Sequence, residues 1–299
     1  MRLLYIVLNY LIDYDMRVVD LFSGCGGLSL GFENAGFEIV AAYDNWQPAI
    51  NVYKANFNHP IFNVNLSDEN TAVKHIKEYR PDMIIGGPPC QDFSSAGKRD
   101  ENNGRGDLTI SYANIISTLK PSWFVMENVS TIIKSTKLAA ARDILKRSGY
   151  GLTQIVLNAA LCGVPQRRKR FIMIGHWGAQ DDFMLETIQK KISDKEMTVK
   201  DYFGERIDVN YYYRHPRSYA RRGIFSVNEP SPTIRGVNRP IPDGYKIHSN
   251  DPIKSLTGVR PLTTKERSMI QTFPEDFIFI GGKSGHCPKF CVNGTRIQL

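Results

Sequence analysis

One stretch decides the fold: Gly86-Gly87-Pro88-Pro89-Cys90-Gln91-Asp92-Phe93-Ser94, directly after the apolar run 83–85. The apolar run predicts a buried strand of a parallel sheet, and the glycines and prolines end that strand abruptly. Because proline fixes φ and restricts the residue before it, Pro88-Pro89 predicts a stiff loop that presents Cys90. Open α/β sheets bind ligands just outside the carboxyl ends of their strands, so this thiol is placed for chemistry. A lone cysteine after a turn is more often inert packing, and only the neighbouring motifs favour a reactive thiol.

Upstream, a strand over 17–22 leads into the glycine-rich turn 23–27 and a helix over 28–34. A strand, a glycine-rich turn and a helix start in this order form the geometry that binds nucleotides, although the spacing does not match GxGxxG. The next strand, 37–43, ends at Asp44, which suits hydrogen bonds from ribose hydroxyls or is simply an exposed strand-end acid. A short strand, 61–64, ends near Asn65, whose amide suits an adenine edge.

Downstream of Cys90, residues 95–106 are polar and punctuated by glycine, which predicts a surface loop. Lys98, Arg99 and Arg105 lie in this loop, where they either face solvent or close on phosphates. A helix over 108–119 follows, and then a strand over 123–126 that delivers Glu127-Asn128-Val129. This is a second functional group at the carboxyl end of a strand.

A helix over 138–147 and a strand over 152–157 precede the cationic run Arg167-Arg168-Lys169-Arg170, which opens an apolar strand over 171–175. Such a run is most often a solvated face. Side chains alternate along a strand, however, so Arg168 and Arg170 should face one side and Arg167 and Lys169 the other. One of these pairs is predicted to enter a cleft.

The totals describe an ordinary globular protein: 299 residues, 42% hydrophobic and 23% charged, with a net charge of +8. The excess of basic residues favours a polyanionic partner. Five scattered cysteines without a CxxC pair argue against a disulfide framework or a zinc site, so we predict no metal and a reducing cytoplasm. The apolar opening of the chain is too short to span a bilayer, and residues 1–15, which precede Met16, are predicted to be a dispensable extension.

Four stretches, DLFSGCGG at 20–27, GGPPCQDFS at 86–94, ENV at 127–129 and QRRKR at 166–170, together resemble the cytosine-C5 DNA methyltransferases. The similarity continues at 260–267 and 273–277, and it covers about 17–280. The resemblance implies an α/β fold, namely a Rossmann-like sheet that uses S-adenosylmethionine, with a second, smaller target-recognition domain. It predicts a catalytic and cofactor-binding domain over 16–176, to which 259–284 returns, and a target-recognition domain over 177–258.

The resemblance also implies a mechanism. A thiolate of Cys90 adds to C6 of a flipped-out cytosine, a protonated Glu127 contacts N3, Arg170 holds O2 and Arg168 supports the pocket. The residues that the resemblance assigns to S-adenosylmethionine are Phe22, Ser23, Gly24, Gly26, Asp44, Asn65, Pro89 and Leu108. Asn65 stands where the family often has aspartate, so it keeps a carbonyl acceptor and loses the charge.

The regular alternation of strands and helices stops between about 177 and 258, where aromatic residues and arginines interleave over 211–239. This composition suits contacts to double-stranded DNA, although a solvated arginine-rich loop gives the same pattern. Thr233-Ile234 fits the family's threonine–aliphatic pair that anchors the smaller domain. The residues predicted to bind DNA are Lys98, Arg99, Arg105, Arg221, Arg222, Thr233, Arg235 and Arg239.

The tail 285–299 departs from the family, because it lacks the last motif and its closing helix, and 1–15 does not supply that motif either. We therefore carry two hypotheses. The first is a DNA cytosine-C5 methyltransferase, the protective half of a bacterial restriction–modification system with a cognate endonuclease, in the cytoplasm on the nucleoid. The second is a catalytically impaired DNA-binding subunit or remnant that needs a complementing polypeptide. Methylation of tRNA is a third, weaker interpretation.

Overall fold

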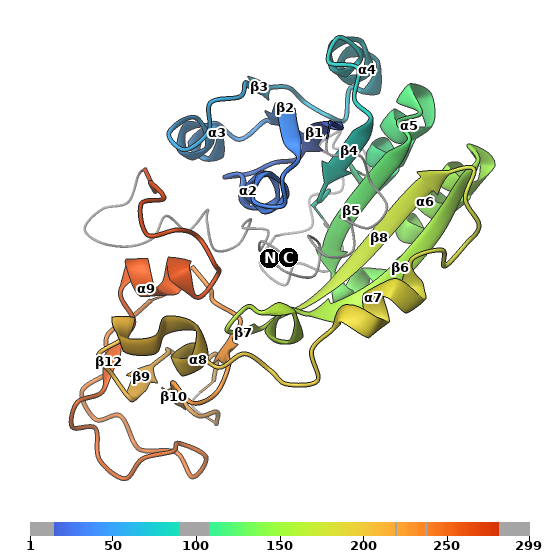
Figure 1. Cartoon of the computed structure of the whole chain (residues 1–299). Helices are drawn as coiled ribbons and strands as arrows, with labels where there is room; N and C mark the ends of the chain where they lie inside the picture. Colours follow the sequence, from blue (N-terminus) through green and yellow to red (C-terminus); the bar gives the residue numbers. More distant parts are fainter. Residues whose placement is uncertain (1–14, 90–107, 219, 237, 281–299) are drawn as a thin grey trace.

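The computed structural model describes residues 15–89, 108–218, 220–236 and 238–280. Its largest feature is a seven-stranded sheet in the order β3-β2-β1-β4-β5-β8-β6 (Figure 1). Neighbouring strands run parallel from β3 to β5, whereas β8 runs antiparallel to both of its neighbours. The strands are β1 (Arg17–Leu21), β2 (Glu38–Asp44), β3 (Ile61–Asn63), β4 (Met83–Gly86), β5 (Trp123–Val129), β6 (Tyr150–Asn158) and β8 (Lys169–Trp177).

Helices cover both faces of this sheet, which explains why its central strands are apolar throughout. Val18 and Val19 are neighbours in β1, and they belong to separate apolar clusters on the two faces. One face packs against α2 (Gly27–Glu33) and α7 (Leu185–Lys191). The other packs against α4 (Glu69–Lys77), α5 (Leu108–Leu119) and α6 (Thr136–Arg147), while α3 (Gln47–Lys54) packs beside β2 and β3.

The predicted α/β fold is confirmed, and the differences lie at the ends of elements. The strand predicted over 123–126 continues to Val129, so Glu127 and Asn128 are strand residues rather than loop residues. The strand predicted over 171–175 begins at Lys169 and is preceded by the short strand β7 (Gln166–Arg167). Short 3-10 helices, η1 (Ser130–Lys134) and η2 (Ala159–Cys162), follow β5 and β6.

A smaller domain lies beside the large sheet, at its lower left in Figure 1. Its sheet has the order β10-β9-β12 and is accompanied by α8 (Val199–Phe203) and η3 (Gly204–Arg206). The strands are β9 (Tyr211–Tyr213), β10 (Ile224–Ser226) and β12 (Arg260–Pro261). Arg260 and Pro261 pair with β9, so the small sheet includes residues that follow position 258.

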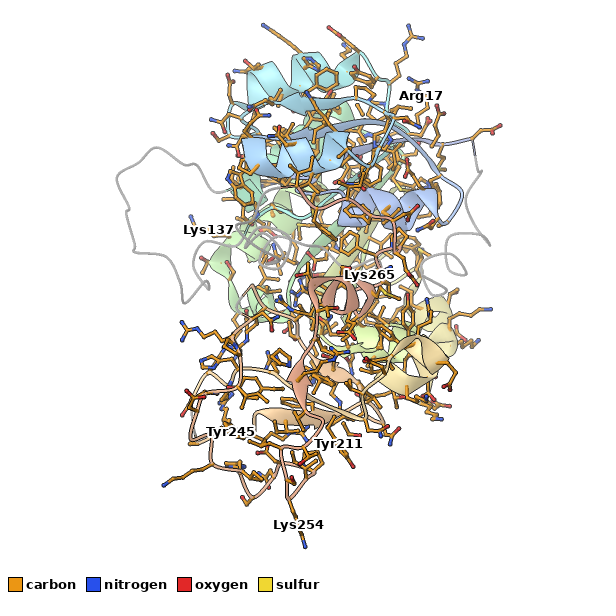
Figure 2. The ribbon with its side chains drawn as sticks, turned by 90° about the vertical axis from the view of Figure 1, so that its left-hand side faces the viewer. Arg17, Lys137, Tyr211, Tyr245, Lys254 and Lys265 are labelled. Atoms are coloured by element: carbon orange, nitrogen blue, oxygen red, sulfur yellow. The ribbon has the colours of Figure 1, made fainter. Side chains whose placement is uncertain are left out.

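Two features join the domains. Strand β11 (Ser231–Pro232) pairs in parallel with β7, which runs on into the large sheet. An apolar cluster also combines Cys25 and Val52 of the large domain with Phe203, Ile234 and Phe273. Helix α9 (Thr264–Met269) lies between the domains, and Figure 2 shows its Lys265 midway between Arg17 at one end and Tyr211, Tyr245 and Lys254 at the other.

No helix in the described ranges is long and apolar enough to cross a membrane.

The closest packing in the sheet gives a stability prediction. A Cβ added at Gly175 of β8 would lie 1.9 Å from Cε1 of Phe124 in β5, inside the van der Waals limit. We expect Gly175→Ala to lower the free energy of unfolding by about 1–3 kcal/mol, measured by thermal or denaturant unfolding. In the double variant with Phe124→Leu the combined loss should be smaller than the sum of the single losses, and strictly additive losses would contradict the clash.

Candidate functional site

The centre of the candidate site is a buried ion pair between the strand-end carboxylate and an arginine of the cationic run. Nε of Arg170 lies 2.7 Å from Oε1 of Glu127, and the two side chains are only 14% and 8% exposed. The pairing of β5 with β8 brings these side chains close. Arg170 of β8 lies opposite Val129 of β5, and Glu127 lies two residues before Val129, so its side chain is on the same face of the sheet. Burial lowers the pKa of Arg170, and the Glu127 carboxylate beside it opposes that shift.

The predicted alternation along the cationic run is confirmed. Arg168 is buried beside Arg170, whereas Arg167 and Lys169 are exposed on the other side. Burial, and next the charge of Arg170, lower the pKa of Arg168 to about 9, while Glu127 acts in the opposite direction. Arg167 instead pairs with Glu196 at 2.7 Å. The structure therefore brings Arg168, Arg170 and Glu127 together.

The loop that leads to Cys90 is tied to this pair by a neighbouring side chain. Nδ2 of Asn128 donates to the Pro88 carbonyl at 2.9 Å, and its Oδ1 accepts the Val129 N–H at 2.8 Å. Pro88 is buried and Pro89 is exposed. Cys90 and the basic residues Lys98, Arg99 and Arg105 lie outside the described residues.

The glycine-rich turn after β1 is held to the end of β2. The Ser23 N–H donates to the Tyr43 carbonyl at 3.0 Å, and the Gly24 N–H donates to Oδ2 of Asp44 at 2.8 Å. Oδ1 of Asp44 accepts a hydrogen bond from the Trp46 N–H at 2.8 Å, so each carboxylate oxygen accepts a hydrogen bond from a backbone N–H group. Phe22 has a φ of 56°, which a non-glycine residue seldom adopts.

Polar groups at this turn remain for a ligand. Oγ of Ser23 is buried and has no hydrogen-bond partner in the part of the chain that the structure describes. An ionised carboxylate has about four acceptor positions, so Asp44 keeps capacity beyond the two backbone N–H groups. Trp46, close to Asp44, is 41% exposed and adds a flat apolar surface. It was not among the residues predicted from the sequence to bind the cofactor.

Three other predicted cofactor residues have well-defined surroundings. Oδ1 of Asn65 already accepts from Oγ and N of Ser67, at 2.8 and 3.1 Å. Gly26 has a φ of 89°, and an added Cβ would lie 2.2 Å from the ring of Phe57, which follows α3, so close packing demands glycine there. Leu108 is half-buried at the start of α5.

The two cysteines that the structure describes, Cys25 and Cys162, are buried, which suits packing rather than nucleophilic chemistry. Burial raises the pKa of Cys162 to about 11. Within the described ranges no group of three or more histidine, cysteine, aspartate or glutamate side chains is arranged to hold a metal ion.

The predicted DNA-binding residues of the small domain fall into two kinds. Arg222 pairs with Glu229 at 2.6 Å and lies over the Phe225 ring, so the fold already uses its charge. Oγ1 of Thr233 donates to the Arg167 carbonyl at 2.9 Å, which fits its predicted anchoring role. Arg221 and Arg239 are exposed, and Arg235 is half-buried.

Comparison with known proteins identifies this arrangement. Residues 16–295 match the family described as C-5 cytosine-specific DNA methylase. The chain belongs to this family. The match runs beyond Ile280, where the resemblance was expected to end. The enzyme uses S-adenosylmethionine to methylate C5 of cytosine in DNA, as the sequence predicted.

Its relatives include two bacterial enzymes. Type II methyltransferase M.HindV of Haemophilus influenzae is 60% identical over 273 residues, which are 90% of this chain and 89% of the relative. Type II methyltransferase M.HgiDI of Herpetosiphon aurantiacus is 56% identical over 269 residues, 90% of this chain and 87% of the relative. Among solved structures, DNMT2 of Spodoptera frugiperda is 20% identical with a TM-score of 0.68, and covers 95% of this chain and 97% of that one, a likeness that shows the fold.

The double use of Asp44 predicts a selective effect on cofactor affinity. In Asp44→Asn one oxygen becomes an NH₂ group, which cannot accept from Gly24 or Trp46. The turn should loosen, and the dissociation constant for S-adenosylmethionine should rise by about tenfold or more, measured by calorimetry. Asp68 is the matched control, because it also accepts backbone and hydroxyl hydrogen bonds, but at the start of α4. Equal affinities for Asp44→Asn and Asp68→Asn would contradict the assignment.

The tie between Asn128 and the Pro88 carbonyl predicts an effect on catalysis. Asn128→Ala leaves that carbonyl without its donor and frees the loop before Cys90. We expect kcat to fall by about a hundredfold, with much less change in cofactor affinity, because small misplacements near the reacting atoms are costly. Asn114 of α5 also donates through its side-chain amide, to Oε1 of Glu69 in α4, and in the described part of the chain it does not contact the loop before Cys90, so Asn114→Ala should leave kcat unchanged. A kcat for Asn128→Ala within threefold of the wild-type value would exclude this role, because a threefold change in rate corresponds to only about 0.6 kcal/mol of activation free energy.

Proposed function

We propose that the enzyme methylates a flipped-out cytosine in a specific duplex sequence through a covalent intermediate on Cys90, with Glu127 and Arg170 binding the base. The observation that carries this assignment is the buried Glu127–Arg170 pair beside the Pro88 loop that Asn128 holds. A charged pair so poorly solvated suits a ring that must be bound edge-on away from water.

The steps follow from the chemistry of cytosine. The Cys90 sulfur adds to C6, the C5–C6 double bond opens, and negative charge moves toward N3 and O2. A protonated Glu127 donates to N3 and so neutralises that charge. Bound S-adenosylmethionine would supply the methyl group to C5, with S-adenosylhomocysteine as the leaving group. The methylated C5 then loses its proton to a base, the C5–C6 double bond re-forms as the Cys90 sulfur leaves C6, and N3 returns its proton to Glu127.

Arg170 has donors to spare for the base. Its Nε faces Glu127, and its Nη1 donates to the Lys169 carbonyl at 2.8 Å. A guanidinium carries five N–H groups, so others remain to hold O2. A base that covers Glu127 would exclude water from the pair. Arg168, buried behind the pair, supports its position.

The turn after β1 fits S-adenosylmethionine. Ser23 and Gly24 would face its polar groups, because the Ser23 hydroxyl is buried without a described partner and the Gly24 N–H is fixed by Asp44. Asp44 would accept from the ribose hydroxyls, and Trp46 offers a surface for the adenine. Phe22, Gly26, Asn65, Pro89 and Leu108 complete the set that the family resemblance suggests.

We further propose that the enzyme is the modification half of a restriction–modification system with a cognate endonuclease and acts on the bacterial nucleoid. The names of the relatives, type II methyltransferases, support this context. The complementing polypeptide predicted from the tail stays a prediction. Methyl transfer to DNA by the purified single chain would contradict it.

The mechanism predicts a clear separation of binding from chemistry. Cys90→Ala should abolish methyl transfer to duplex DNA, and Glu127→Gln should reduce kcat by about 10²–10⁴, because the amide cannot deliver a proton. Both variants should still bind DNA. The assay uses labelled S-adenosylmethionine with unmethylated genomic DNA, and a parallel reaction with tRNA should give no transfer.

Covalent trapping provides the decisive control. Wild type should form a denaturation-resistant adduct with DNA containing 5-fluorocytosine, since fluorine does not leave as a proton does, and Cys90→Ala should form none. Glu196→Gln is the matched control for Glu127→Gln, because Glu196 is also paired with an arginine of the same run but on the opposite side. An adduct with Cys90→Ala would disprove the nucleophile.

A further inference from the structure

Two loops of the small domain are tied together by arginine side chains that bind backbone carbonyls. Nη2 of Arg214 donates to the Thr233 carbonyl at 2.8 Å, and Nη2 of Arg235 donates to the His215 carbonyl. From α9, Nη2 of Arg267 donates to the carbonyl of Arg235. Residues 214–217 are thereby held beside residues 233–236, which with 238–239 form the second segment, and we call the two segments the paired loops.

The paired loops gather positive charge without matching carboxylates. Among the described residues, Arg214, Arg217, Arg235 and Arg239 form none of the ion pairs that other arginines of this domain make with Glu229, Glu266 or Glu275. Nε of Arg235 is also buried without a hydrogen-bond partner in the described ranges. The cluster is therefore built around carbonyl acceptors, which do not neutralise a cation.

The electrostatic consequences are visible in the titration of the cluster. Burial, and next the charges of Arg235 and Arg217, lower the pKa of Arg214 to about 10. Burial and then Arg239 and Arg235 lower the pKa of His215. Burial is the main cause of each shift, and the neighbouring arginines add to it, which is consistent with the geometry of a cluster without carboxylates.

Exposure separates the arginines that hold the loops from those that can reach a ligand. Arg214 and Arg235 are half-buried and committed to carbonyls, whereas Arg217 and Arg239 are exposed, one on each loop. Arg222, by contrast, is neutralised by Glu229. The exposed pair therefore has both the free reach and the uncompensated charge that a phosphate contact needs.

We propose that Arg217 and Arg239 are the phosphate contacts of the small domain, one from each of the paired loops, and that they grip the DNA backbone irrespective of base sequence. This inference rests on the proposed function, because it takes duplex DNA as the ligand, and it replaces Arg222 by Arg217 among the contacts.

The test is the salt dependence of binding to a long mixed-sequence duplex, measured by fluorescence anisotropy across a series of potassium chloride concentrations. Each phosphate contact releases counterions, so Arg217→Gln and Arg239→Gln should each reduce the slope of log K against log salt by about 1, and together by about 2. Arg206→Gln is the matched control, because Arg206 is half-exposed but paired with Glu275, and its slope should stay that of wild type.

Two further measurements keep the outcome clear. Since both residues are exposed, the melting temperature of each variant should stay at the wild-type value, and trapping of wild type on 5-fluorocytosine tests the chemistry separately. Wild-type slopes for Arg217→Gln and Arg239→Gln would overturn the inference while leaving the Cys90 mechanism intact. Failure of wild type to trap would remove the mechanism and leave the slope measurement valid, because the slope requires no chemistry.

Discussion

The site depends on two opposite charges held at an edge of the sheet where water hardly reaches them. Taking Glu127 and Arg170 out of water is expensive, and their attraction compensates only if the geometry is good. That geometry comes from strand direction. Because β8 runs antiparallel to β5, its first residues lie at the edge where β5 ends. The arginines at the start of β8 therefore lie beside Glu127 near the end of β5. A strand parallel to β5 would begin at the opposite end of the sheet.

The same edge receives the glycine-rich turn, and there the backbone itself is under strain. A positive φ at Phe22 costs of order 1–3 kcal/mol, so the surrounding structure must hold it. The Ser23 and Gly24 N–H groups do so through the Tyr43 carbonyl and Asp44 at the end of the neighbouring strand. Asp44 is therefore part of the architecture as well as a candidate ligand group, and the pairing of β1 with β2 sets the conformation of the glycine-rich turn before any ligand binds.

Local sequence patterns predicted the features that depend on residues close together along the chain, such as the type of each element and the direction in which its side chains point. The alternation of 167–170 sorted Arg168 and Arg170 from Arg167 and Lys169 correctly, because a strand has a fixed period of two. The position of β8 between β5 and β6 was not predicted, since apolar runs do not state which strand lies beside them. The commitment of Arg222 to Glu229 and of Asn128 to the Pro88 carbonyl was missed for the same reason, because each partner is set by tertiary structure. The DNA-binding role of Arg221 and the nucleophilic role of the Cys90 thiol remain predictions.

One continuous stretch of backbone, residues 166–170, both contacts the small domain and carries Arg170 of the buried ion pair. Residues 166–170 carry Arg168 and Arg170 on the side of the site, while their backbone belongs to the small domain's junction. Gln166 and Arg167 pair with Ser231 and Pro232, and the Arg167 carbonyl accepts from Thr233, the first residue of the loop that carries Arg235 and Arg239. The apolar cluster that combines Cys25 and Val52 with Phe273 closes the other side of the junction. These contacts fix the start of β8 and the loop of Arg235 and Arg239 to each other. The position of the small domain and the position of the Glu127–Arg170 pair are therefore coupled through the same stretch of backbone.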